Sequence, residues 1–244
     1  MAVERKTLTQ LSVPICLETL FYMLSGMVDT LMLSSVGDQA VGAVGTANTY
    51  IGVFIIMFGV ISSGMIAVMS QNIGAGRPGI AYQARQLGLL FNALTGILMS
   101  VILAFFSGRI LKIVSIAPAL LEPAETYLKI VGGACFLNAL IPIFSSYLRV
   151  FGYTKHSLIG TIVGNAVNII FNSVFLFVFK WGVMGVAVAT VISKVVNLII
   201  VAAMGAVLIK AKQSPERIQP RKILAQIVKI GFPSAFETAL YNVA

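Results

Sequence analysis

The sequence predicts an all-α integral membrane protein, a bundle of six transmembrane helices followed by the start of a seventh. Of the 244 residues, 58% are hydrophobic and only 10% are charged, whereas soluble domains carry about 25% charged residues. The mean hydropathy is +0.97. Charge-poor runs long enough to cross a bilayer recur along the chain. This composition excludes an ordinary water-soluble enzyme, which needs a polar surface around its core.

The membrane spans follow from runs of about 20 apolar residues, the length that a helix needs to cross the hydrocarbon core. Six such runs comprise residues 11–33, 47–70, 87–107, 130–148, 158–179 and 183–209, and a seventh begins near residue 223. The first run has no small-residue cleavage site, so we expect it to stay in the membrane. Residues 108–126 predict a short helix in the interface, and Pro142 predicts a kink in the fourth span.

The basic residues predict the orientation, because short cytoplasmic loops carry an excess of Lys and Arg. With a cytoplasmic amino terminus, twelve of the 17 basic residues fall on the cytoplasmic side. Arg109, Lys112, Lys129 and Lys180 fall on the outer side, and Lys194 lies within the sixth span. We therefore expect a multi-pass protein of the inner or plasma membrane with its amino terminus in the cytoplasm.

The net charge of +9 would suggest nucleic acid as a partner of a soluble protein. Here the basic residues lie between apolar runs and form no continuous face, so no nucleic-acid partner is expected. Cys16 and Cys135 both fall inside apolar runs and give neither a disulfide framework nor a metal-binding spacing. Nothing in the sequence supports catalysis, a metal centre or a resident cofactor.

Polar side chains form stripes on three of the predicted helices. An ionisable group in mid-membrane costs roughly 2.5 to 3.5 kcal/mol, so each needs a partner or a function. Residues three or four apart share one helix face, as in Glu18, Tyr22, Ser25 and Asp29, in Thr161, Asn165, Asn168 and Asn172, and in Thr190, Lys194 and Asn197. Each stripe is either functional or a hydrogen-bonded seam between helices. Lys194 either pairs with Asp29 and holds it ionised, or snorkels or lines a water-filled cavity without a specific role.

An internal repeat links the two ends of the chain. PICLETLFY from Pro14 reappears as PSAFETALY from Pro233, with Pro, Glu, Thr and Tyr identical. Six spans separate the copies, so both enter the membrane from the same side. Such parallel repeats are typical of secondary transporters; a chance match between two apolar helices is the alternative.

The motifs resemble those of multidrug and toxic compound extrusion (MATE) transporters. They are VDTLMLSSVG at residues 28–37, SQNIGAGRPGIAYQA after the second span, LRVFGYTKHS after the fourth, and GNAVNIIFN and GVMGVAVATVIS across the fifth and sixth. The resemblance implies two six-helix lobes. Residues 1–209 would form the amino-terminal lobe, 210–222 a cytoplasmic linker, and 223–244 the start of helix seven in a second lobe of the same protein. The complete transporter would be nearly twice this length.

The resemblance also implies a cation or proton site in this lobe. Carried over from the family, it corresponds to Asp29, Asn168, Asn172 and Thr190. Some family members have Asp where this chain has Asn172, which leaves Asp29 as the main carrier. Further candidates for the substrate cleft or for coupling are Glu18, Tyr22, Lys194 and Glu237. Glu237 is a weak candidate, because the family's better-known acidic position falls about one turn later, at Tyr241.

The function implied is secondary antiport, with small organic cations or drugs exported in exchange for H⁺ or Na⁺. No metal is expected beyond Na⁺ at Asp29. One alternative is a lipid-linked oligosaccharide flippase of related fold, which should carry several cationic side chains in its cavity. Another is a non-transporting membrane assembly subunit, in which the polar stripes only hold helices together.

Overall fold

The computed structural model describes residues 8–209 and 219–243. These residues form helices joined by short turns, and no strand occurs among them. The helices are α1 (Leu8–Ser34), α2 (Asp38–Gly74), α3 (Pro78–Ile113), α4 (Pro118–Tyr127), α5 (Phe136–Val150), α6 (Thr154–Ser173), α7 (Gly182–Leu208) and α8 (Pro220–Val243). Two π-helical segments follow α4 and α6, namely η1 (Leu128–Gly132) and η2 (Val174–Val178). The all-α membrane fold that the sequence predicts is confirmed.

Five of the helices, namely α1, α2, α3, α6 with η2, and α7, are long and apolar enough to span a membrane. A sixth span results if Pro118–Gly132 and Phe136–Val150 count as one span that bends by 43°. Helix α8 carries Lys229 and Glu237 in its middle and is not among them. It nevertheless has a proline inside the helix, Pro233, as α1 has Pro14. Most of the predicted linker lies outside the described residues.

The bend of the fourth span lies elsewhere than predicted. It falls between Gly132 and Phe136, whereas Pro142 lies inside the uninterrupted helix α5. A β-carbon on Gly132 would come within 2.9 Å of the Leu103 side chain, so this glycine allows η1 to pack closely on α3. The short helix expected in the connection is α4, which begins at Pro118 and continues directly into η1.

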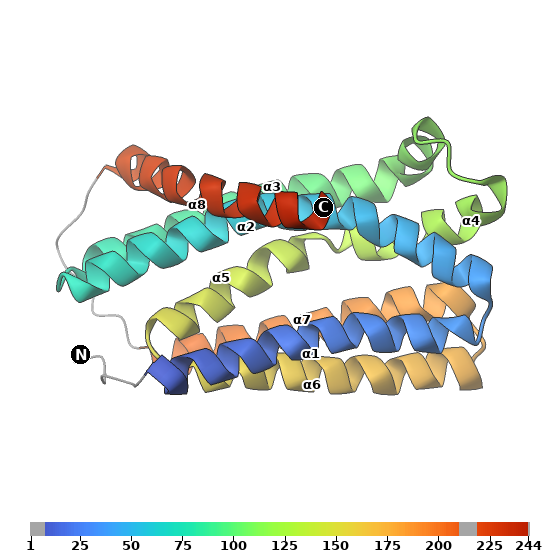
Figure 1. The fold of residues 1–244 in the computed structure, drawn as a ribbon, viewed down its shortest axis with the longest axis horizontal. Coiled ribbons are helices and arrows are strands. Elements are labelled where there is room, and N and C mark those ends of the chain that lie inside the picture. The colour runs from blue at the N-terminus through green and yellow to red at the C-terminus, as the bar shows by residue number, and fades with distance from the viewer. Residues whose placement is uncertain (1–7, 210–218, 244) are drawn as a thin grey trace.

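The helices form two layers (Figure 1). Helices α1, α6 and α7 run side by side in the lower layer, α2, α3 and α8 form the upper layer, and α5 crosses between them. Two clusters of buried apolar side chains fill the lobe, one around Leu33, Leu128 and Val186 at one end and one around Met65 and Ile143 at the other. The polar residues of the predicted stripes lie mostly in the lower layer.

Candidate functional site

Asp29 contacts two asparagines of α6 inside the lobe. Its Oδ1 accepts a hydrogen bond from Asn172 Nδ2 at 2.6 Å, and the same amide lies 3.2 Å from Asn168 Oδ1. Asn168 also interacts with the Asp29 carboxylate. Both asparagines are buried, while Asp29 is half-buried. The structure therefore brings together three of the four residues predicted for the cation or proton site.

The helix register explains why these side chains meet. Helices α1 and α6 run parallel, and their polar contacts join residues 143 or 144 positions apart: Glu18 with Thr161, Phe21 with Asn165, and Asp29 with Asn172. Two parallel helices with the same rise of about 1.5 Å per residue keep such an offset along their length. The spacings of 4, 3 and 4 on α6 thus produce a polar seam that faces α1.

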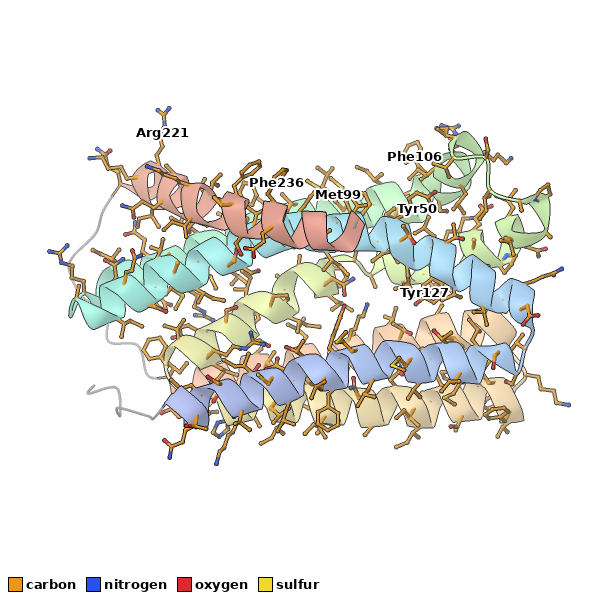
Figure 2. The ribbon with its side chains drawn as sticks, in the orientation of Figure 1. Tyr50, Met99, Phe106, Tyr127, Arg221 and Phe236 are labelled. Atoms are coloured by element: carbon orange, nitrogen blue, oxygen red, sulfur yellow. The ribbon has the colours of Figure 1, made fainter. Side chains whose placement is uncertain are left out.

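Thr190 comes from α7 and is buried, and its hydroxyl donates to the carbonyl of Val186 at 2.9 Å. It also interacts electrostatically with Tyr127, which in turn interacts with the Asn48 side chain of α2. Tyr127 is 3% exposed and lies between the two layers (Figure 2). Because Tyr127 also interacts electrostatically with Asp29, Thr190 lies near the Asp29 group, while its own hydroxyl is bonded to Val186.

The sequence reasoning missed Tyr127 and Asn48. Tyr127 lies between the predicted interfacial connection, residues 108–126, and the fourth predicted span, and Asn48 lies between Thr46 and Thr49 in a stretch of small residues. Only the fold places them beside the Asp29 group. The one available signal was the hydroxyl of Tyr127, because a buried hydroxyl requires a partner, whereas Asn48 is exposed.

Lys194 is half-buried on α7 and interacts electrostatically with Asp29 and Cys135. In the described part of the chain, the ion pairs are Lys129 with Glu125 and Arg149 with Glu18, so Lys194 forms none with Asp29. Lys194 therefore lies near the Asp29 group without pairing directly with its carboxylate.

Glu18 belongs to a separate polar cluster nearer the start of α1. Its carboxylate is buried, pairs with Arg149 Nη2 at 2.8 Å and accepts hydrogen bonds from Ser157 Oγ at 2.9 and 3.0 Å. Arg149 lies in the last turn of α5, which the sequence reasoning treated only as part of a loop. Glu18 thus has its own partners and does not touch the Asp29 group.

Tyr22 and Glu237 lie outside both clusters. The Tyr22 side chain is 64% exposed, although it interacts electrostatically with Tyr127. Glu237 is exposed on α8. Neither residue is brought against Asp29.

The Asp29 group has the donor set of a small hard cation. Asn172 Oδ1 is buried and has no hydrogen-bond partner, beside a carboxylate that is only half-buried. Carboxylate and amide oxygens are the ligands that such cations prefer. No group of three His, Cys, Asp or Glu suited to a transition metal occurs within residues 8–209 and 219–243. The residues therefore fit Na⁺ or a proton better than a transition metal.

A cavity of about 390 Å³ lies elsewhere, on α3 and the segment leading into α5. Val101, Phe105 and Phe136 are among its mostly apolar lining residues. None of the candidate residues lines it. This cavity is therefore separate from the Asp29 group.

Comparisons with known proteins match this chain to one family model and to transporter sequences. The MatE family model matches residues 14–174. "Uncharacterized transporter YisQ" of Bacillus subtilis is 34% identical over 98% of this chain and 54% of its own length. "Probable multidrug resistance protein NorM" of Thermotoga maritima is 26% identical, over 98% of this chain and 52% of its own length. The chain thus spans about half the length of these relatives.

The fold has solved counterparts. A structure described as MATE in the bent conformation superposes with a TM-score of 0.84 at 20% identity, and covers 95% of this chain and 52% of that one. A structure of MATE in the straight conformation gives a TM-score of 0.83 at 21% identity over the same shares. The extent of the family match, together with this fold, identifies the chain as a member of the MatE family.

Proposed function

We propose that the chain is one lobe of a secondary antiporter that exports small organic cations or drugs in exchange for H⁺ or Na⁺. The observation that carries this proposal is the contact between the Asp29 carboxylate and Asn172, whose Oδ1 is buried without a partner. A carboxylate and an unpartnered amide oxygen inside a lobe can take up and release a cation. The relative from Thermotoga maritima that is named a multidrug resistance protein supports the substrate class.

Cation binding at Asp29 would change the lobe by altering its hydrogen bonds. The anionic carboxylate accepts a hydrogen bond from the Asn172 amide. A protonated carboxylate can also donate a hydrogen bond, and a Na⁺-bound carboxylate uses its oxygens as ligands of the ion. A ligand shifts a two-state equilibrium by its differential affinity for the two states. Ion binding from outside would thus favour the state that releases the exported cation. A second lobe of the same protein would supply the other wall of the cleft.

The ion gradient supplies enough free energy for useful export. One charge that moves down a membrane potential of 100 mV gives about 2.3 kcal/mol. At 1.36 kcal/mol per tenfold ratio, this corresponds to a concentration ratio of about 50. One coupled ion is therefore sufficient, and Asp29 alone can serve as its carrier.

The cationic side chains do not favour the flippase. A pyrophosphate needs several free Lys or Arg groups around it. In the described part of the chain, Arg149 is paired with Glu18, and the Arg85 guanidinium lies 4.2 Å from the centre of the Tyr147 ring. Among the residues that the structure describes, Lys194 alone lies in the middle of a span near a polar group. One such cation is too few for a pyrophosphate site.

The test is ethidium efflux from cells that express the full-length gene, with and without an uncoupler of the ion gradient. We expect efflux by the wild type to depend on the gradient and to be lost in Asp29→Asn at an unchanged protein level. Asp38→Asn is the matched control, because Asp38 is exposed in the first turn of α2. Gradient-driven efflux by Asp29→Asn at the wild-type rate would overturn the assignment.

A further inference from the structure

The Glu18 cluster joins three helices through a buried carboxylate. Arg149 of α5 pairs with Glu18 Oε1 at 2.8 Å. Ser157 of α6 donates to both carboxylate oxygens, and the Thr161 hydroxyl lies 3.5 Å from Oε1. Glu18 is 8% exposed. The amino-terminal half of α1 is thereby tied to α5 and α6 at one point.

A buried ion pair of this kind fixes the relative position of its helices more than it adds stability. Apolar side chains of similar size are often as stabilising as a buried ion pair, whereas a buried charge left without its partner is strongly destabilising. A slip of α1 by one residue would move Glu18 about 1.5 Å along the axis and rotate it by about 100°. The carboxylate would then leave Arg149 and Ser157, so the pair disfavours every other register.

The same register places the carboxylate of the proposed ion site. Asp29 follows Glu18 by 11 residues, which is close to three helical turns, so both side chains face α6. Between them, Asn165 Nδ2 donates to the Phe21 carbonyl at 2.6 Å. A slip at Glu18 would therefore rotate Asp29 away from Asn172.

We propose that the Glu18–Arg149 ion pair is a positioning element that sets the register of α1 on α6 and thereby holds Asp29 against Asn172. This inference rests on the proposed function for its transport consequences, but the register itself is measurable without transport. Arg149 and Glu18 act through Asp29 and do not bind the exported molecule or the coupling ion.

The direct test is cross-linking in the full-length protein. Asp29→Cys and Asn172→Cys are combined, because these side chains touch in the wild type, and the native Cys16 and Cys135 are replaced by Ser and Ala. With Glu18→Gln added, we expect the yield of the oxidative cross-link to fall about tenfold, because the half-buried Arg149 guanidinium then lacks its charged partner. An unchanged yield would overturn the proposal.

The matched control for cross-linking is Lys129→Gln. It removes the other described ion pair, which Lys129 forms with Glu125 at 2.6 Å and which is largely exposed. An exposed pair contributes little, so the yield should stay at the wild-type level. A loss as large as that in Glu18→Gln would mean that any ion-pair deletion loosens the lobe, and would also overturn the proposal.

Transport adds a second readout with the native Asp29 and Asn172 in place. In proteoliposomes, Glu18→Gln and Arg149→Gln should each change the half-saturating concentration of the coupling ion at least threefold, an effect on about the scale of one weakened hydrogen bond. Arg149→Lys and the exchange Glu18→Arg with Arg149→Glu, which retain opposite charges, should both return it toward the wild-type value. A merely structural pair would change only the amount of active protein.

The outcomes separate the two proposals. If the wild type shows no ion-coupled transport but the cross-link depends on Glu18, the register stands and the proposed function fails. If Glu18→Gln abolishes transport while Arg149→Gln leaves the half-saturating concentration unchanged, Glu18 itself carries the ion and the positioning role is wrong.

Discussion

Replacing Asn172 by alanine distinguishes the two coupling ions. The substitution removes the Nδ2 donor, 2.6 Å from Asp29 Oδ1, and the unpartnered Oδ1 in one step. A hydrogen bond to a charged group contributes about 1.5 to 3 kcal/mol. We take the lower end, because Asp29 is half-buried and Asn168 still lies near it. At 1.36 kcal/mol per tenfold change, the expected effect is about tenfold in ion affinity.

The sign of this change depends on the ion. If Na⁺ is coupled, the loss of an oxygen ligand raises the half-saturating Na⁺ concentration about tenfold. If H⁺ is coupled, the anionic carboxylate loses a donor, so it binds a proton more readily and the half-maximal rate is reached about one pH unit higher. The assay measures ethidium transport in proteoliposomes of the full-length protein, across a series of Na⁺ concentrations and of pH values.

Asn165→Ala is the matched control. It also removes one hydrogen bond between α1 and α6, the bond from Asn165 Nδ2 to the Phe21 carbonyl, but it does not touch Asp29. We expect its half-saturating ion concentrations to stay within about twofold of the wild type. The reasoning is refuted if Asn172→Ala retains wild-type dependence on both ions, or if Asn165→Ala produces the same shift.

Three further predictions follow from the packing and the orientation. Gly160→Leu should destabilise the protein by about 1 to 3 kcal/mol, because a β-carbon at this position would lie 2.6 Å from the Val201 side chain of α7. Thermal unfolding in detergent measures this loss. Gly52→Leu is the control and should be nearly neutral, because the space around Gly52 is open. Lys155→Cys should react with an impermeant maleimide only after the cells are opened, whereas Lys112→Cys should react in intact cells. The reverse pattern would contradict a cytoplasmic amino terminus. Tyr127→Phe should slow ion-coupled efflux several-fold without changing the protein level, because its hydroxyl contacts polar side chains of both α2 and α7; an unchanged rate would exclude Tyr127 from the site.

Local periodicity made the spans and the polar seam predictable. The spacing of Thr161, Asn165 and Asn172 repeats every helical turn, so one face of α6 could be recognised without knowing its neighbours. That Asp29 lies against this face depends on the register of two helices distant in sequence. The family resemblance supplied the pairing, and hydropathy alone did not contain it.

The parts that were missed depend on tertiary contacts. Arg149 looked like a loop cation, because its partner lies 131 residues earlier in the chain. Tyr127 belongs to a connection that folds back between the layers. The bend of the fourth span falls near Gly132, where close packing on α3 requires a glycine. Pro142, the stronger local signal, is accommodated inside α5.

Glu18 and Asp29 lie on one face of α1 and cannot be told apart by their spacing in the sequence. They differ in how far the charged groups around them compensate the carboxylate charge. Glu18 has a guanidinium at 2.8 Å and two hydroxyl groups nearby, so its charge is already compensated by the protein. Asp29 has neutral amide donors and interacts with Lys194 only beyond ion-pair distance. A compensated carboxylate has little to gain from a mobile cation, whereas one whose direct partners are neutral amides retains its attraction for a positive charge. The structure therefore favours Asp29 over Glu18 as the ion carrier for a reason that helical spacing does not contain.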